Sequence, residues 1–336
     1  DTMTLMWPQL MEWLYRYARL AVQVFLVVGG YLAAQSVMHK PITHPLAQIA
    51  KRYLRLVPFY ALALALISVA VAMSRETIHA NWLPNEPTLW QFTAHALLIH
   101  DLLGFEALSS GAWYVAIDFQ LYLLVLVSLV VVNRFVAQRA SLRANRVLWQ
   151  VWLVLTLLSL IRWSLNDDLD IYGLYYFGAY GLGLLAFRAR QSRIPLKGWV
   201  VLTLMGLLAL WVDPRWRVTT AWSVALLLAS APDRWSAVPA APGIWRQGVQ
   251  RLSRISYSVF MIHYAVSLIV SAVVTAFWPD SVLANAVGML MAVLGAVLAG
   301  SVLYRLAEKS PQDWRHWGLA VGLFMASVAL AMKMSG

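Results

Sequence analysis

The chain has 336 residues, of which 61% are hydrophobic and only 12% are charged. Soluble domains carry about twice that share of charged residues, so the composition excludes an ordinary soluble domain and predicts an integral membrane protein. There is no cysteine, which excludes disulfides, thiolate metal sites and a cysteine nucleophile.

The apolar residues lie in long unbroken runs, and 17 Trp and 14 Tyr suit aromatic belts at the two water interfaces. This pattern predicts an all-α bundle of transmembrane helices rather than a β-barrel, whose strands would alternate apolar and polar residues. A span needs about 20 apolar residues, so we predict about ten spans in one domain over residues 1–336. They are roughly residues 18–38, 57–74, 111–133, 146–165, 171–188, 196–212, 216–231, 255–277, 282–305 and 316–334. Residues 89–103 are predicted to form an interfacial or re-entrant helix.

The net charge of +11 at pH 7 comes from Lys and Arg in alternate loops, while the intervening loops hold most of the acids. Because Lys and Arg near span ends stay cytoplasmic, we predict that both ends of this chain lie on the outer side of the membrane. The bases are spread over short loops that face anionic lipid, so we expect membrane lipids as partners and no nucleic acid.

Asp118 lies near the start of the apolar run at residues 111–133. An ionised carboxylate inside a membrane costs about 2.5–3.5 kcal/mol on insertion scales, so it should be paired, hydrogen-bonded or facing water. Tyr114 and Tyr122 lie one helical turn before and after it and share its face. Asp118 is therefore a candidate functional acid, or alternatively a structural residue bonded to a tyrosine or to Arg162.

A polar stripe follows the apolar segment around residue 263. Ser256, His263, Ser267 and Ser271 are separated by seven, four and four residues, which places them on one helix face. A neutral imidazole near the membrane midplane has the chemistry of a general base, since burial favours the uncharged form. The alternative is a hydrogen bond between His263 and a serine that only holds helices together.

Arg52 and Arg55 are one helical turn apart at the predicted cytoplasmic end of a span, just before Pro58, which we expect to end the local regularity. Two guanidinium groups so placed suit bidentate binding of phosphates. Basic residues at an inner membrane face are otherwise mostly signals of topology.

The remaining histidines give no metal-site pattern, and we predict no metal. His95 and His100 are five residues apart, so a regular helix would not place them on one face. Gly29 and Gly30 lie inside a predicted span, where close helix packing is our preferred interpretation.

Five motifs, taken in order, resemble those of the acyltransferase-3 family of polytopic membrane enzymes. They are VFLVVGGYLAAQ from Val24, with Gly29 in place of the family's Ser; the pattern Arg52-x-x-Arg55-x-x-Pro58; WYVAIDFQLY, where Trp113, Asp118 and Tyr122 align while Tyr114 replaces Ser and Asp replaces Glu; ISYSVFMIHY from Ile255; and YRLAEKSP from Tyr304, with Ser310 before Pro311. The resemblance spans residues 25 to 311.

The resemblance implies transfer of an acyl group, usually acetyl from cytoplasmic acyl-CoA, to a hydroxyl of a sugar, glycan or lipid reached from the outer side. Such reactions modify polysaccharides at the bacterial inner membrane. The implied roles are CoA phosphate binding by Arg52 and Arg55, and an acceptor-side acid at Asp118. Substrate-side residues would be Trp113, Tyr114, Tyr122, Ser256 and Tyr257, and the closing motif would give structural roles to Arg305 and Glu308.

One motif of the family, an Arg and a catalytic His separated by ten residues in the first helix, is absent from this sequence. We expect that a first helix precedes Asp1 in the complete protein. Otherwise His263 replaces that base, or the chain does not catalyse.

A transporter or flippase of a glycolipid or small anion is the alternative function, using the same polar stripe without covalent chemistry. The sequence shows no inverted repeat of the kind that many secondary transporters contain, which weakens this alternative. A membrane scaffold without activity is the third possibility.

Overall fold

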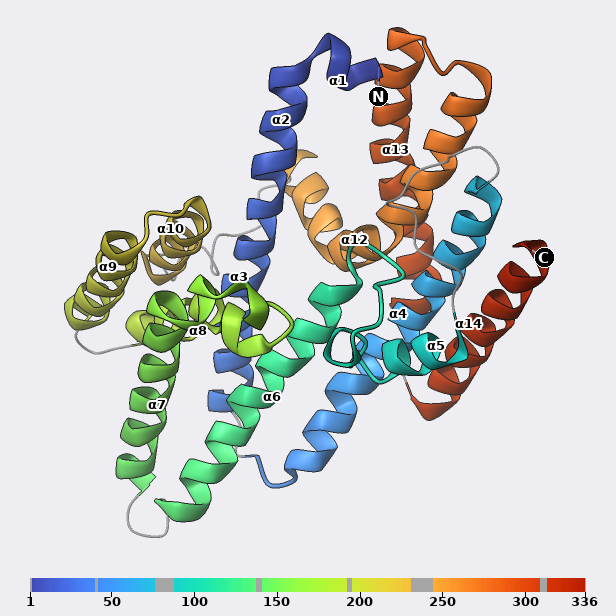
Figure 1. The fold of residues 1–336 in the computed structure, drawn as a ribbon. Coiled ribbons are helices and arrows are strands. Elements are labelled where there is room, and N and C mark those ends of the chain that lie inside the picture. Colours follow the sequence, from blue (N-terminus) through green and yellow to red (C-terminus); the bar gives the residue numbers. More distant parts are fainter. Residues whose placement is uncertain are drawn as a thin grey trace. The chain divides into compact units, whose positions relative to one another are not determined.

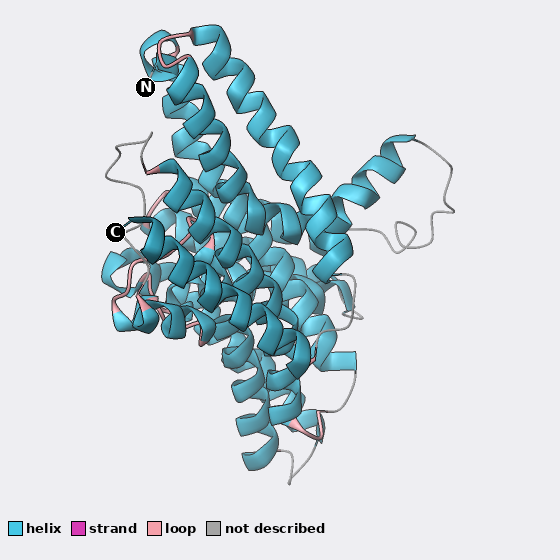
Figure 2. Ribbon diagram, turned by 90° about the vertical axis from the view of Figure 1, so that its right-hand side faces the viewer, coloured by secondary structure: helices cyan, strands magenta, loops and turns pink. Residues whose placement is uncertain are grey.

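The computed structural model describes residues 2–39, 42–75, 88–136, 141–191, 195–230, 244–308 and 313–335. These residues form helices and their connections, with no strand among them (Figure 2). The α-helices are α1 (Thr2–Met6), α2 (Pro8–Tyr17), α3 (Ala21–His39), α4 (Pro45–Ser74), α5 (Leu89–Ala96), α6 (Ala112–Phe135), α7 (Ser141–Ile161), α8 (Gly173–Gln191), α9 (Pro195–Val212), α10 (Trp216–Ser230), α12 (Ile244–Phe277), α13 (Val282–Leu303) and α14 (Trp314–Ser335) (Figure 1). The all-α prediction is confirmed for this part of the chain.

Six of the described segments are long and apolar enough to cross a membrane, by length and composition. They are Pro8–His39, Pro45–Ser74, Ala112–Phe135, Arg143–Leu165, Gln247–Phe277 and Val282–Leu306. A shorter apolar helix covers Leu196–Val212. The protein is therefore an integral membrane protein with multiple candidate spans.

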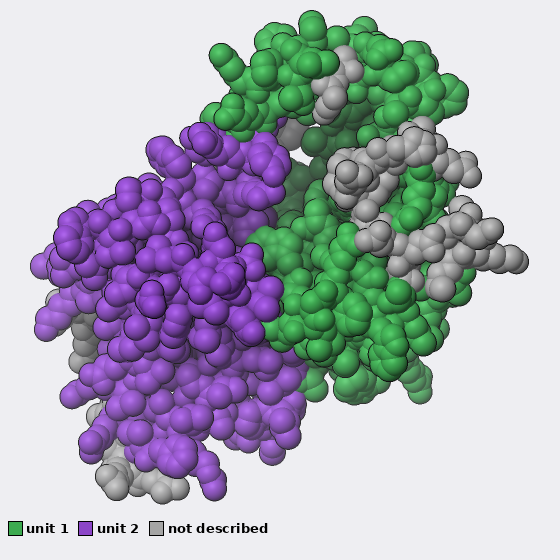
Figure 3. Space-filling model, viewed as in Figure 1, with its two compact units in different colours: residues 1–13, 50–116, 240–336 green, residues 14–49, 117–239 purple. Residues whose placement is uncertain are grey.

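The chain divides into two compact units (Figure 3). Unit 1 contains residues 1–13, 50–116 and 240–336, and unit 2 contains residues 14–49 and 117–239. Helix α6 contributes its first turn to unit 1 and the rest of its length to unit 2. Each unit is described by itself below.

Unit 2 is built around a close contact between α3 and α8. A Cβ atom on Gly30 would collide with the carbonyl oxygen of Tyr180, and one on Gly183 would collide with that of Val27. Because both collisions are with backbone atoms, only glycine allows this approach. The interpretation of Gly30 as a packing residue is confirmed, and the contact fixes α3 against α8.

Unit 1 contains α4, which continues as one helix through Pro58. The prediction that Pro58 ends the regular structure is wrong. Proline lacks the N–H that would bond the carbonyl one turn earlier, yet helices in apolar surroundings tolerate this where neighbouring groups cover the bend. Pro58 is buried, and the aromatic ring of its neighbour Phe59 packs 5.2 Å from that of Tyr257.

The helix predicted at residues 89–103 is shorter than expected. Thr88 and Gln91 form a capping box at its start. Helix α5 ends at Ala96, and a short 3₁₀ helix, Asp101–Leu103, follows after a turn. The turn begins at Leu98, whose φ of 59° lies in the left-handed region and stops the helix.

Candidate functional site

A cavity of about 780 Å³ lies in unit 1 between α12 and α13, with Met3 of α1 at its edge. Its walls are mostly valine, alanine and methionine, and its polar side chains lie largely on α12. They are His263, Ser267, Ser271 and Thr275 of α12 and Asn285 of α13. Three members of the predicted polar stripe therefore line one cavity.

The imidazole of His263 is half-buried and held in one orientation. Its Nδ1 lies 2.6 Å from the carbonyl oxygen of Phe260. A carbonyl only accepts, so Nδ1 carries the proton and donates, and Nε2 is the proton-accepting nitrogen of the neutral ring. The geometry gives His263 the form that a general base requires.

The aromatic residues at the start of α6 that belong to unit 1 reach the neighbourhood of His263 through Phe260. The ring of Tyr114 packs edge-on 5.4 Å from that of Phe260, and Phe260 lies 5.8 Å from His263. Trp113 in turn packs 6.1 Å from Tyr114. Gly111 leaves room for the Phe260 ring, which a Cβ there would approach to 3.2 Å.

Ser256 and Tyr257 lie one to two turns before His263 and outside the cavity lining. Ser256 is exposed, and its hydroxyl donates to the carbonyl of Ser253 at 3.0 Å. Tyr257 is half-buried and packs its ring against that of Phe59. Ser256 therefore lies outside the cavity that His263, Ser267 and Ser271 line, and its expected role toward the substrate stays a prediction.

Arg52 and Arg55 lie in the first half of α4, three residues apart. Arg52 is half-buried and Arg55 is exposed. Tyr53, between them, ties this part of α4 to two other helices of unit 1: its hydroxyl donates to the carbonyl of Ala96 at 2.7 Å and accepts from Trp317 Nε1 at 3.3 Å. The arginines therefore stand on an anchored segment.

Asp118 and Tyr122 belong to unit 2, so they are described apart from the cavity. Both are buried in α6, at 7% and 6% exposure. Asp118 Oδ1 would lie 3.7 Å from a Cβ on Gly29, and the ring of Tyr180 lies 3.2 Å from the same position. Gly29 thus packs beside the carboxylate, a position where the family motif has serine.

Arg305 is exposed and lies in the π-helical turn Tyr304–Glu308 that ends α13. The side chain of Glu308 lies outside the described residues. The structural role expected for these two residues stays a prediction.

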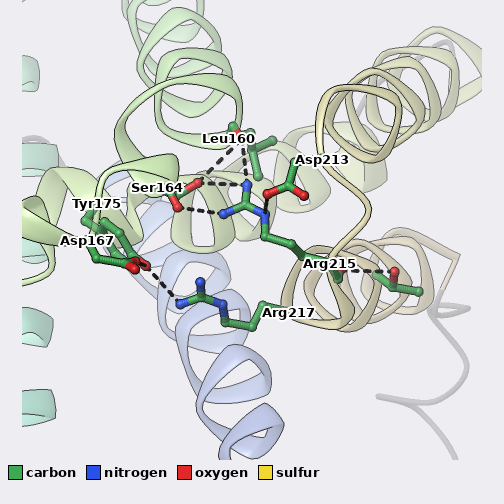
Figure 4. Close-up of polar contacts among 8 residues, drawn as sticks. Leu160, Ser164, Asp167, Tyr175, Asp213, Arg215 and Arg217 are labelled. Carbon is green, nitrogen blue, oxygen red and sulfur yellow. Dashed lines mark hydrogen bonds and ion pairs between the residues drawn. The ribbon is translucent and has the colours of Figure 1, made fainter.

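Unit 2 contains a polar network that the sequence reasoning missed (Figure 4). Arg215, in the connection between α9 and α10, donates to the carbonyls of Ser164 at 2.6 Å and Leu160 at 3.1 Å, and to the Ser164 hydroxyl at 3.2 Å. Its Nε lies 2.9 Å from Asp213. Burial lowers the pKa of Arg215, which the charge of Asp213 opposes. Arg215 thus bonds the carbonyl of Leu160 in the last turn of α7 and that of Ser164 in the short 3₁₀ helix that follows, where carbonyls lack partners within the helix.

Arg217 forms a second set of polar contacts in this region (Figure 4). It donates to the Tyr175 hydroxyl at 2.9 Å, and that hydroxyl donates to Asp167 at 3.0 Å. Gln23 lines a small cavity of about 30 Å³ together with both arginines. The sequence feature that could have indicated these contacts is the pair Arg215 and Arg217, which lies in an otherwise acidic loop region.

The sequence also gave no indication that His95 and His100 meet. Their rings stack 4.0 Å apart with 17° between the planes. Burial lowers the pKa of His95 to about 4, against the hydrogen bond to Gln91. Burial first, and then the neighbouring His95, lower the pKa of His100 to about 3. The expected separation of these residues is wrong because the helix that would have kept them apart ends before His100.

The helices define a polytopic helical membrane protein, and unit 1 holds a mostly apolar cavity lined on α12 by one imidazole and three hydroxyl groups. The profile of the acyltransferase-3 family, described as an acyltransferase domain, matches residues 3–306. The chain belongs to this family. No curated protein and no solved structure matches it.

Proposed function

We propose that this membrane acyltransferase moves an acyl group, most simply acetyl, from cytoplasmic acyl-CoA to a hydroxyl of a sugar, glycan or lipid acceptor. Family membership supports acyl transfer. The observation that carries the proposal is His263, which lines the cavity with Nδ1 fixed on the Phe260 carbonyl.

In the proposed reaction His263 Nε2 takes the proton of the acceptor hydroxyl. The oxygen attacks the thioester carbonyl carbon, the C–S bond breaks, and the proton passes from His263 to the leaving thiolate. The Phe260 carbonyl holds the ring through both proton transfers. The apolar cavity walls limit the access of water, which would otherwise hydrolyse the thioester.

Arg52 and Arg55 are proposed to bind the phosphates of the donor. Guanidinium groups pair with phosphate oxygens in a bidentate manner, and these two project from adjacent turns of α4. The exposed Arg55 and half-buried Arg52 fit a phosphate group at a surface.

Asp118, together with Trp113, Tyr114 and Tyr122, is proposed to serve the acceptor side. We further propose a topology of about ten spans in the cell inner membrane, with residues 1 and 336 facing outward. Cysteines placed one at a time in the loops and labelled from outside test this topology, because the natural chain contains no cysteine.

The test of function is incubation of the protein in lipid nanodiscs with radiolabelled acetyl-CoA and membrane glycolipids. Label on a hydroxylated acceptor is expected. His263→Gln should lower the rate about 10²–10⁴-fold, the usual contribution of a general base. His316→Gln, an exposed histidine on α14, is the control that retains activity. Vectorial movement of an unmodified solute would support transport instead.

Donor binding is tested separately by equilibrium titration with acetyl-CoA. Arg52→Ala and Arg55→Ala should each weaken binding about tenfold, since a hydrogen bond between charged groups contributes about 1.5–3 kcal/mol. Wild-type donor affinity in both variants would remove the arginines from the proposal. Full transfer by Asp118→Asn would similarly reduce Asp118 to a packing residue.

A further inference from the structure

The small cavity of unit 2 is lined by polar side chains that the proposed reaction does not use. It lies between α3, α8 and α10, has a volume of about 30 Å³ and is open on one side. Its polar lining comes from Gln23 of α3, Tyr175 of α8, and Arg215 and Arg217 beside the start of α10. A cavity needs at least about 10–15 Å³ to hold one water molecule. Two oxygen atoms of a larger ligand therefore fit inside, while the rest of the ligand stays outside.

Gln23 faces this cavity from a buried position. The residue is 9% exposed, and its side-chain amide has no hydrogen-bond partner among the residues that the structure describes. The buried Gln91, by contrast, donates to the Glu106 carbonyl at 2.6 Å. Leaving a buried polar group unpaired costs about 1–3 kcal/mol. Gln23 therefore offers both a donor and an acceptor to a ligand in the cavity.

The two arginines differ in how fully the protein itself pairs them. Arg215 bonds the carbonyls and the hydroxyl described above, and it forms an ion pair with Asp213. Arg217 makes one hydrogen bond, to the Tyr175 hydroxyl at 2.9 Å, and no ion pair with a carboxylate within the described part of the chain. Because a guanidinium group carries several N–H donors, most donors of Arg217 are available to an anionic group.

A carboxylate lies next to Arg217, separated from it by the Tyr175 hydroxyl (Figure 4). That hydroxyl accepts from Arg217 and donates to Asp167 Oδ1 at 3.0 Å. Asp167 is exposed, and its Oδ2 makes no hydrogen bond in the ranges that the structure describes. Asp168 and Asp170, also exposed, follow it in the chain. A cationic and an anionic group side by side fit a zwitterionic ligand better than a simple anion.

Exposed tryptophans near the cavity indicate its depth in the membrane. Trp216, which lies between the two arginines in the sequence, is 64% exposed, and Trp211 near the end of α9 is 82% exposed. Tryptophan concentrates at the boundary between the apolar part of a membrane and the lipid headgroups. The polar residues 213–215 connect the two apolar helices at the same level. The open side of the cavity is therefore expected to face the headgroups of phospholipids.

The charges of the cavity select among ligands. A metal cation is repelled by the two guanidinium groups. A neutral ligand leaves the charge of Arg217 unpaired. A phosphodiester accepts from Arg217 and from the Gln23 amide, and hydrogen bonds between charged groups are the stronger ones. An ammonium group two carbons away from that phosphate donates to the neighbouring carboxylate.

We propose that this cavity binds a phospholipid whose headgroup is phosphoethanolamine. The phosphate oxygens enter the cavity and accept from Gln23 and Arg217, and the ammonium group donates to Asp167 Oδ2. The glycerol and the acyl tails stay in the surrounding membrane. The bound headgroup joins α3, α8 and α10, and the site does not depend on the proposed acyl transfer.

Native mass spectrometry of the full chain, released from detergent micelles, measures the binding of single lipids. Phosphatidylethanolamine, phosphatidylglycerol and phosphatidylcholine, all with dioleoyl tails, are titrated separately. The Kd for phosphatidylethanolamine should be the lowest. Arg217→Gln and Gln23→Leu should each raise it about tenfold, as expected for one lost hydrogen bond to a charged group. Leucine is close to glutamine in size and removes an unpaired amide, so Gln23→Leu should keep the fold.

Asp167→Asn tests the contact with the ammonium group. Asparagine keeps an oxygen that accepts from Tyr175 but loses the negative charge. The preference for phosphatidylethanolamine over phosphatidylglycerol should therefore disappear, while the Kd for phosphatidylglycerol should not rise. An unchanged preference would overturn the assignment of the ammonium group to Asp167.

Two matched variants on α7 of the same unit, Arg143→Gln and Gln150→Leu, change exposed residues and should bind lipid as wild type does. Equal Kd values for the three lipids in the wild type would overturn the headgroup assignment. An unchanged Kd in both Arg217→Gln and Gln23→Leu would overturn the site. Binding of soluble glycerophosphoethanolamine as tightly as the lipid would show that the ligand is not a lipid. No acyl donor is present, so these outcomes are separate from those of the transfer assay.

Discussion

The α3–α8 contact of unit 2 and the α12–α13 pair of unit 1 use glycine with different results. Gly30 and Gly183 let two backbones touch, and nothing fits between them. Gly288 of α13 faces the side chain of Val274 and lines a cavity of about 780 Å³. Glycine permits close approach in both places, but the two helices come into direct contact only where the glycine faces the backbone of the neighbouring helix. The first contact holds two helices directly together, and the second leaves the cavity in which we propose that the acceptor reacts.

Gly30→Ala should produce the largest change in stability. The added methyl group collides with a carbonyl that cannot rotate away, so α3 and α8 must separate. We expect a loss of about 1–3 kcal/mol in the free energy of unfolding, the usual cost of overpacking. Denaturant titration in nanodiscs measures it.

Gly318→Ala is the matched control, because a Cβ at that position of α14 meets no atom within 4 Å. Removing a glycine from a helix should raise stability by about 0.5–1 kcal/mol. A Gly30→Ala protein as stable as wild type would show that the α3–α8 contact is not rigid.

Lowering the pH should reduce the stability of the protein through the buried histidines of unit 1, and exposed histidines should contribute little to this loss. In the unfolded chain a histidine has a pKa near 6.5, whereas His95 and His100 are buried as neutral rings with pKa values of about 4 and about 3. Below pH 6.5 the unfolded state therefore binds protons that the folded state does not, and stability falls with pH. Between pH 7.5 and 5.5 the loss is about 1 kcal/mol per histidine.

The comparison of wild type with His100→Gln isolates the contribution of His100 to the pH dependence of stability. The free energy of unfolding of the variant should fall less over this pH interval, by one histidine's share. His44→Gln removes an exposed histidine of unit 2 and should keep the wild-type pH dependence. Equal pH dependence in all three proteins would mean that His100 is accessible to protons in the folded state.

Ala292→Phe should give the smallest change in stability. Ala292 lines the α12–α13 cavity, which has room for the ring, so the free energy of unfolding should stay within about 0.5 kcal/mol of wild type. The KM for the acceptor should rise because the cavity is partly filled. A loss of stability as large as that of Gly30→Ala would contradict the difference between the two helix pairs.

Much of the fold could be predicted because the apolar runs, and the charged residues that separate them, can be recognised within short stretches of sequence. The helices near residues 57–74, 111–133 and 282–305 follow directly from such runs. The sequence predicts neither the end of α5 nor the course of α4 beyond Pro58, since both depend on packing. Leu98 has a positive φ, a conformation that glycine usually adopts. Pro58 lies buried inside α4, surrounded by packed side chains.

The candidate site also contains some residues that the sequence predicts and others that it does not. The sequence predicted that His263, Ser267 and Ser271 share one face, because residues four apart in a helix point in nearly the same direction. The stacking of His95 and His100 was not predicted, since it requires a turn between them. Arg215 was also missed, because its partners Leu160 and Ser164 are about fifty residues away in the sequence.

The Tyr53 hydroxyl joins three helices through two hydrogen bonds, and it stands between the two arginines proposed to bind the donor. Its acceptor is the carbonyl of Ala96, the last residue of α5, which directly follows His95 in the chain. A displacement of this part of α4 would therefore also move the end of α5, next to the stacked pair of His95 and His100. Tyr53→Phe would remove both hydrogen bonds and leave the arginine-bearing part of α4 without these links to α5 and α14.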